Sequence, residues 1–142
     1  GMKFSYITFP LPEPSPLFGT SIARPIVPVE LTAGAITIGY AALVDSGADF
    51  CIFDGSLGEL LGLDVRSGEP IQFGGVQDTA PSRAYLHEVV ISIGGSRHAI
   101  RAGFSYDIAP HGYGLLGQKG FFDMFIVAFD VLKEEIEIKE RK

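Results

Sequence analysis

The sequence predicts an all-β domain, a closed or nearly closed barrel with one or two short helices, and three features support this class. Apolar residues alternate with others in "IVPVEL" (26–31), and "AITIGYAALV" (35–44) is rich in β-branched and aromatic residues. Glycines, 18 in all, punctuate the chain, and several are paired as in tight turns between strands. Helical patterns are short, so strands must supply most of the core.

Length and composition predict one domain that is large enough to bury a hydrophobic core, since the chain has 142 residues and is 46% hydrophobic. Four prolines punctuate the stretch 1–22, which predicts an extended arm packed on the domain or on a partner. The folded domain is expected over 23–142.

Charge and cysteine usage exclude several functions. The net charge is −6 and no basic cluster is present, so no nucleic-acid partner is expected. No uninterrupted apolar segment suits a signal peptide or a membrane span, so we expect a cytoplasmic protein without a membrane partner. The single cysteine, Cys51, permits neither an internal disulfide nor a Cys-based zinc site, and no metal or cofactor is expected.

The elements follow in order from residue 26. Residues 26–31 and 35–44 form a hairpin, whose first strand Pro25 and Pro28 place at a sheet edge or beside a bulge. A short strand, "FCIF" (50–53), precedes a helix in "SLGELLGL" (56–63). Ser56 would cap this helix with Glu59 as its capping-box partner, and Gly62 would end it.

The second half of the chain predicts strands separated by glycine turns. The segment "PIQFGGVQDTAPSRAYLHEVVISI" (70–93) predicts a strand, a Gly-rich turn, a polar loop and a second strand, and a tight Gly-Gly turn at 94–95 leads into "RHAIRAGFSY" (97–106). "YGLLGQKGFF" (113–122) predicts a strand entering a short helix. Two strands about a turn near 133–135 close the chain.

Asp45 ends an apolar strand and is followed by Ser46 and Gly47. Backbone amides can orient a carboxylate in such a loop, and glycine lets another segment approach closely. Two carboxylates a few ångströms apart share one proton, so one can act as base on a water while the other protonates the carbonyl under attack. The chain has one Asp-Ser-Gly, so a two-fold dimer would have to supply the second carboxylate. On its own, however, the tripeptide more often closes a loop with an Asx-type hydrogen bond.

Two segments in the same order favour the catalytic interpretation. "ARPIVPVELTAGAITIGYAALVDSGADFCIF" (23–53) resembles the opening of retroviral-type, retropepsin-like aspartic proteases, and "YGLLGQKGFF" (113–122) resembles the Leu-Leu-Gly segment before their C-terminal helix. "LLGQKGFFDMFIVAFD" (115–130) is similar to single-domain bacterial members. The resemblance spans 23–138 and is loose between the two segments. It implies a retropepsin-like barrel, assembled as a two-fold homodimer, that acts as an aspartic endopeptidase on a peptide or protein substrate.

The resemblance also implies residue roles. Asp45 is the catalytic aspartate, the Ser46 hydroxyl joins a hydrogen-bond lattice between the two catalytic loops, and Gly47 permits their close packing. Ala48 and Asp49 line the cleft, where Asp49 would hydrogen-bond the substrate main chain. Arg24 corresponds to an arginine that, in the retroviral enzymes, contacts the aspartate equivalent to Asp49 in the other protomer. An equal alternative is that Arg24 is a solvated cation on the surface.

The flap over the cleft is expected at "QFGGVQ" (72–77), where Gly74, Gly75 and Val76 would offer main-chain hydrogen bonds to a peptide. An ordinary hairpin turn fits nearly as well, and residues 78–83 depart from a compact flap. Gln118 stands where many retroviral members carry arginine, which removes a charge-assisted contact to Asp49.

Other chemistry is weaker. His87, His98 and His111 are too far apart for a local metal motif, and Cys51 in its apolar strand is typical of a buried small hydrophobe. Ser46 as a hydrolase nucleophile would need a strand-to-helix elbow, whereas this segment runs from strand to strand. A catalytically silent peptide-binding or dimerisation module on the same fold stays open as the alternative function.

Overall fold

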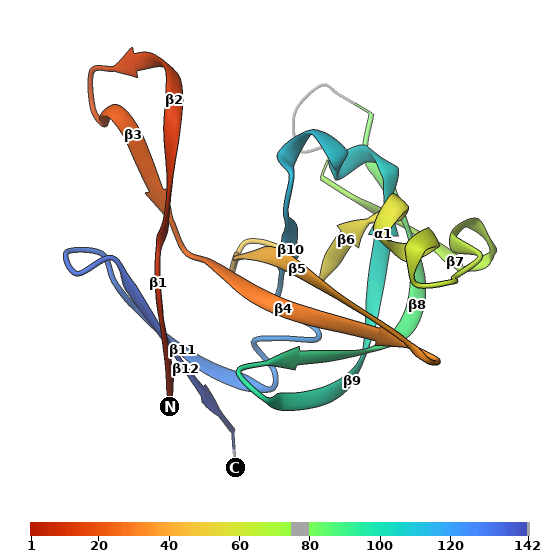
Figure 1. The fold of residues 1–142 in the computed structure, drawn as a ribbon. Helices are drawn as coiled ribbons and strands as arrows, with labels where there is room; N and C mark the ends of the chain where they lie inside the picture. Colours follow the sequence, from red (N-terminus) through yellow and green to blue (C-terminus); the bar gives the residue numbers. More distant parts are fainter. Residues whose placement is uncertain (75–79, 142) are drawn as a thin grey trace.

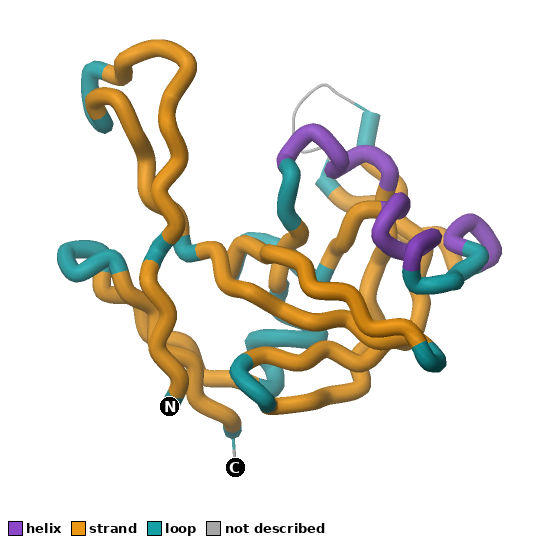
Figure 2. Tube along the Cα trace, in the orientation of Figure 1, coloured by secondary structure: helices purple, strands orange, loops and turns teal. Residues whose placement is uncertain are grey.

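Strands dominate the chain, which confirms the predicted all-β class (Figures 1 and 2). A computed structural model describes residues 1–74 and 80–141. The helical segments are α1 (Gly55–Leu60) and the 3₁₀ turns η1 (Val65–Ser67) and η2 (Tyr106–His111). The strands are β1 (Met2–Ser5), β2 (Ile7–Ser15), β3 (Gly19–Arg24), β4 (Ile26–Ala33), β5 (Ile36–Val44), β6 (Ile52–Asp54), β7 (Glu69–Phe73), β8 (Ser82–Ile93), β9 (Ser96–Ser105), β10 (Gly114–Leu116), β11 (Phe125–Asp130) and β12 (Glu135–Glu140).

The main sheet closes into the predicted barrel. Its strand order is β4-β5-β10-β6-β9-β8-β7, and β4 also pairs with β8 from Glu30↔Ser92 to Thr32↔Val90. The expectation that β4 is an edge strand is therefore wrong over these residues. Pro28 precedes the stretch that pairs with β8, so its missing N–H removes no bond from that ladder.

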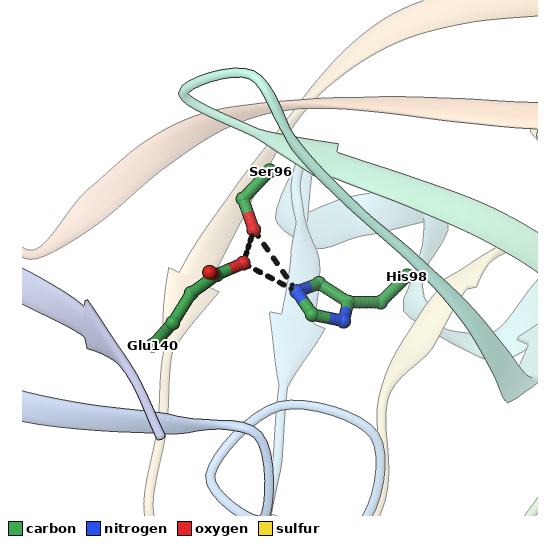
Figure 3. Close-up of polar contacts among 3 residues, drawn as sticks. All are labelled: Ser96, His98 and Glu140. Carbon is green, nitrogen blue, oxygen red and sulfur yellow. Dashed lines mark hydrogen bonds and ion pairs between the residues drawn. The ribbon is translucent and has the colours of Figure 1, made fainter. Parts of the chain in front are cut away.

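A second sheet, in the order β1-β12-β11, joins the two ends of the chain. Residues 2–5 of the expected arm are thus a strand beside the C-terminal strand, and β2 and β3 form a hairpin that extends away from the barrel (Figure 1). The Ser96 hydroxyl and the His98 Nε2 atom both contact Glu140 Oε1, the latter at 2.9 Å (Figure 3). This cluster ties β9 of the barrel to β12 of the second sheet.

The helical segments differ from the sequence prediction at the start of α1 and after β10. The N-cap of α1 is Asp54, whose carboxylate accepts the Ser56 N–H at 2.9 Å, so the prediction of Ser56 as the cap is wrong. Gly62, at φ +84°, follows the C-cap and does end the helix. Residues 117–124 form turns instead of the expected second helix, because Gly120 adopts φ +98° there. Within the described residues, no helix is long and apolar enough to cross a membrane.

The core consists mainly of buried aromatic and branched side chains from β4, β5, β6 and β8 to β12. Phe53 and Phe104 pack with ring centroids 5.9 Å apart, and Phe121 lies 5.2 Å from Phe125 where the barrel meets the second sheet. Cys51 is fully buried beside this core, as the sequence predicted. Burial raises the pKa of its thiol to about 12, because the thiolate would lose its hydration.

The Cys51 thiol should react very slowly with thiol reagents in the native protein. A raised pKa keeps the thiol protonated at pH 8, whereas an unfolded cysteine ionises near pH 8.5, so the thiolate fraction differs roughly a thousandfold. Labelling with a chromogenic disulfide at pH 8, with and without denaturant, measures the ratio. Equal rates in the two conditions would contradict the buried placement.

Candidate functional site

The Asp45 loop is held by backbone hydrogen bonds from both sides. The Asp45 N–H donates to the Leu116 carbonyl at 3.0 Å, and the Ala48 N–H donates to the Asp45 carbonyl at 3.1 Å. The Gly47 N–H donates to Asp45 Oδ1 at 2.9 Å. This is the Asx-type bond of an ordinary turn, and it also fixes the direction of the half-buried carboxylate. The structural and catalytic interpretations of Asp-Ser-Gly are therefore compatible here.

Strand β10 places the segment 113–122 against the segment 23–53, the two stretches that resemble retropepsin-like proteases. It pairs in parallel with β5, with Leu115 opposite Leu43. Just beyond it, the Gln118 N–H donates to the Ala48 carbonyl at 2.8 Å. Gly117 lies so close to the loop that a Cβ atom there would meet the carbonyl oxygens of Phe50 at 2.5 Å and Ala48 at 2.6 Å. Only glycine fits this crossing, which makes the two sequence segments one structural unit.

Gln118 has a role that the sequence comparison with retroviral members did not reveal. Its side-chain Nε2 atom donates to the Ser46 carbonyl at 2.7 Å. The amide therefore supports the middle of the Asp45 loop from the neighbouring segment, and the backbone bond from Lys119 to the Asp49 carbonyl, at 2.9 Å, supports its end.

A pocket of about 200 Å³ opens beside Asp45. The rings of Phe50 and Phe73 form one part of its wall and meet edge to face with centroids 6.1 Å apart. Its charged residues are Asp45 and Asp49. The remaining lining residues are Gly47, Ala48, Ile52, Gly74 and Leu115. An apolar cavity with carboxylates at its wall can hold an uncharged side chain next to an acid–base group.

The apolar lining residues Phe50, Ile52, Phe73 and Leu115 were missed by sequence reasoning. They come from β6, β7, β10 and the loop after Asp45, and tertiary pairing alone brings them together. Two local signals could have identified members of this set: Phe73 precedes the Gly-rich segment, and Phe50 follows Asp49 directly.

The predicted site residues are only partly assembled here. Ala48, Asp49 and Gly74 line the pocket with Asp45 and Gly47, while Ser46 is exposed and lies outside the lining. Gly75 and Val76 lie outside the described residues, so their predicted flap role stays a prediction.

Arg24 makes a contact within its own chain. Its Nη1 atom donates to the Tyr113 hydroxyl at 2.8 Å. The predicted contact of this side chain with Asp49 of the partner subunit stays a prediction.

The three histidines lie in separate places. The Nε2 atom of His87 contacts the Val65 carbonyl at 2.8 Å, and His111 packs against Tyr113. In the Ser96–His98–Glu140 cluster both partners contact the same histidine nitrogen, whereas a nucleophilic triad needs one partner on each nitrogen. No group of three or more His, Cys, Asp or Glu that could hold a metal occurs among the described residues.

The fold is similar to that of a known protease. A crystal structure of a retropepsin-like aspartic protease from Rickettsia conorii matches with a TM-score of 0.57 and 17% sequence identity, covering 80% of this chain and 89% of that chain. A scan against models of protein families and a search of curated proteins gave no match. The predicted retropepsin-like fold is confirmed, and at this level of identity the likeness concerns the fold.

Replacing Gly117 by alanine should destabilise the protein by about 1–3 kcal/mol, because the new Cβ atom would overlap two backbone carbonyls. Denaturant unfolding measures the loss. Gly39→Ala in β5 is the matched control, since nothing lies within 4 Å of a Cβ there, and it should change stability by no more than about 1 kcal/mol. Equal stability of the two variants would show that the crossing is looser than described.

Proposed function

We propose that the protein is an aspartic endopeptidase in which Asp45 of each protomer of a homodimer forms the acid–base pair. The observation that supports this most directly is the oriented Asp45 carboxylate at the wall of an apolar pocket on a retropepsin-like fold. The chain holds one Asp-Ser-Gly, and a shared-proton mechanism needs two carboxylates. A second copy related by a two-fold axis supplies the other.

The chemistry follows from the shared proton. The ionised carboxylate of the pair takes a proton from water as the water oxygen attacks the peptide carbonyl carbon, and the protonated carboxylate gives its proton to the carbonyl oxygen. The tetrahedral diol then collapses: the C–N bond breaks, and the leaving nitrogen takes a proton from the carboxylate that had received it. At the same time one diol hydroxyl gives its proton to the other carboxylate and re-forms the C=O bond, so the pair again holds one proton. The bond from the Gly47 N–H to Asp45 Oδ1 holds one oxygen in place, which leaves Oδ2 to face the water.

The pocket beside Asp45 indicates which substrates fit. Its volume of about 200 Å³ and its Phe50, Ile52, Phe73 and Leu115 walls suit one aliphatic or aromatic side chain. Asp49 in the same lining would disfavour an acidic side chain next to the cut, because like charges repel there. We infer a preference for peptides with an apolar residue beside the scissile bond.

Replacing Asp45 by asparagine should abolish cleavage and leave the fold intact. The asparagine oxygen can still accept the Gly47 N–H, but the amide can neither take nor give the catalytic proton. The measurement is a mass-spectrometric digest of a diverse peptide library from acidic to neutral pH, where a shared-proton pair predicts a bell-shaped profile for the unmodified protein.

Asp64→Asn is the matched control for this experiment, because Asp64 is an exposed aspartate before η1 and outside the pocket lining. It should cleave as the unmodified protein does. Cleavage that survives Asp45→Asn would remove Asp45 from the mechanism. A dimer that cuts no peptide in any form would favour the silent peptide-binding module.

Replacing Phe73 by alanine should enlarge the pocket and shift the preference toward larger apolar side chains. For peptides with a medium-sized apolar residue, kcat/KM should fall about tenfold, since the lost contacts are worth 1–3 kcal/mol. The readout is kcat/KM over a series of peptides that vary at one position. Ile36→Ala, on an exposed side chain at the start of β5, should leave the series unchanged. An unaltered preference in Phe73→Ala would place the substrate side chain elsewhere.

A further inference from the structure

Exposed apolar side chains concentrate in two parts of the chain. The tip of the β2–β3 hairpin carries Leu17, 80% exposed, and Phe18, 54% exposed. The second group lies at the end of β11 and in its turn into β12, and its members are Phe129, Val131 and Leu132, while Ile126 is exposed on the opposite face of β11. The hairpin and this turn project to the same side of the molecule (Figure 1). Apolar surface gathered in this way is typical of an interaction site.

The base of the hairpin is anchored, while its tip stands free of the barrel. Arg24 at the end of β3 donates to the Tyr113 hydroxyl at 2.8 Å, and the Phe9 ring lies 6.3 Å from the Tyr113 ring. The Tyr6 N–H, just before β2, donates to the Glu134 carbonyl at 2.7 Å. The β3 strand has six residues and β2 bulges between Pro10 and Ser15, so the hairpin reaches roughly 17 Å from this anchor. Figure 2 shows the outer part of the hairpin extending without a neighbouring segment.

The anchor lies next to the strand end that carries the catalytic aspartate. The Val44 N–H donates to the Pro25 carbonyl at 2.9 Å, and Asp45 follows Val44 in the chain. A two-fold axis that brings two Asp45 carboxylates together must therefore pass beside the base of the hairpin. The second copy then lies within the reach of a hairpin that extends away from its own barrel.

We propose that the β2–β3 hairpin clasps a second copy of this chain and buries Leu17 and Phe18 against it. This inference rests on the proposed function, since the incomplete Asp45 site is what requires the second copy. Phe129, Val131 and Leu132 supply the counter-surface, because in a two-fold interface a patch of one chain meets a different patch of its partner, and the same pairing occurs twice. Burial of these side chains adds stability to a dimer that the catalytic loops alone would hold weakly.

The prolines of β2 favour side-chain docking over addition of a strand. Pro10, Pro12 and Pro14 occur at every second position and have no N–H to give. Prolines in a strand belong on its free edge, so this edge of the hairpin is a poor template for another strand. The exposed apolar tip is the part of the hairpin suited to side-chain recognition, and in the proposed dimer it meets the partner through its side chains.

The test compares two matched double variants of the full chain. Leu17→Ser with Phe18→Ser removes the apolar tip, and Ile36→Ser with Leu60→Ser removes the same kind of exposed surface from β5 and α1. Sedimentation equilibrium gives the dimer dissociation constant, and thermal unfolding checks that each variant folds. We expect the tip variant to weaken the dimer about tenfold or more, and the control to match the unmodified protein.

Cross-linking places the tip directly. Because Cys51 is fully buried, a Leu17→Cys variant carries one reactive thiol, to which a photoactivated cross-linker can be attached. In a mixture of ¹⁵N-labelled and unlabelled chains, mass spectrometry should find cross-links that join a labelled to an unlabelled peptide. Cross-links confined to one isotope would show the tip packing on its own chain.

The outcomes separate this inference from the proposed function. A chain that stays monomeric at every concentration, or a tip variant that dimerises as well as the control, overturns the clasp. A dimer that the tip variant weakens but that cuts no peptide supports the clasp and contradicts the peptidase. Mixed-isotope cross-links from Leu17→Cys support the clasp whether or not the dimer is active.

Discussion

The close crossing of Gly117 over the Asp45 loop is the constraint on which the site depends. It is possible because β10 pairs in parallel with β5 and continues past the loop at backbone distance, with no side chain between them. Backbone bonds from the segment after β10 then hold the Ala48 and Asp49 carbonyls. Two stretches separated by some seventy positions in the printed sequence thereby become one rigid unit. A loop held in this way presents its carboxylate with little freedom left to lose on binding a substrate.

Most of the fold could be predicted from local pattern, because the strands are long, alternate clearly and are separated by glycine turns. The positions of β4, β5, β8 and β9 follow that pattern closely, whereas the pairing of β4 with β8 that closes the sheet was not predicted. The details of the helices were predicted wrongly where two local preferences compete. Asp54 and Ser56 are both good caps, and the end of β6 at Asp54 decided between them. At 117–124 the glycines outweighed an apolar pattern that suited a helix.

The candidate site was predictable only where a short motif carries it. Asp45 and Gly47 were identified from the chemistry of the Asp-Ser-Gly loop, Ala48 and Asp49 from the resemblance of the segment around it, and all four line one pocket. The apolar wall was not, since Ile52, Phe73 and Leu115 come from strands whose register no single sequence reveals. Gln118 illustrates the same limit: its amide bonds the Ser46 carbonyl across the crossing, a contact that exists only in three dimensions.

A site divided between two chains links catalysis to association. If each chain supplies one carboxylate, the active fraction depends on protein concentration relative to the dimer dissociation constant, and any contact that favours the dimer raises activity at a given concentration. In the proposed dimer the Asp45 loops are short and would have to stay open to substrate, so they would contribute only limited buried area. A projecting hairpin with an apolar tip can supply area at a distance from the cleft without obstructing it. In such a protein the hairpin tip, which favours the dimer, and the Asp45 loop, which performs the chemistry, are different surfaces. The chain connects them at the β3–β4 junction, where the Pro25 carbonyl accepts the N–H of Val44, the residue before Asp45.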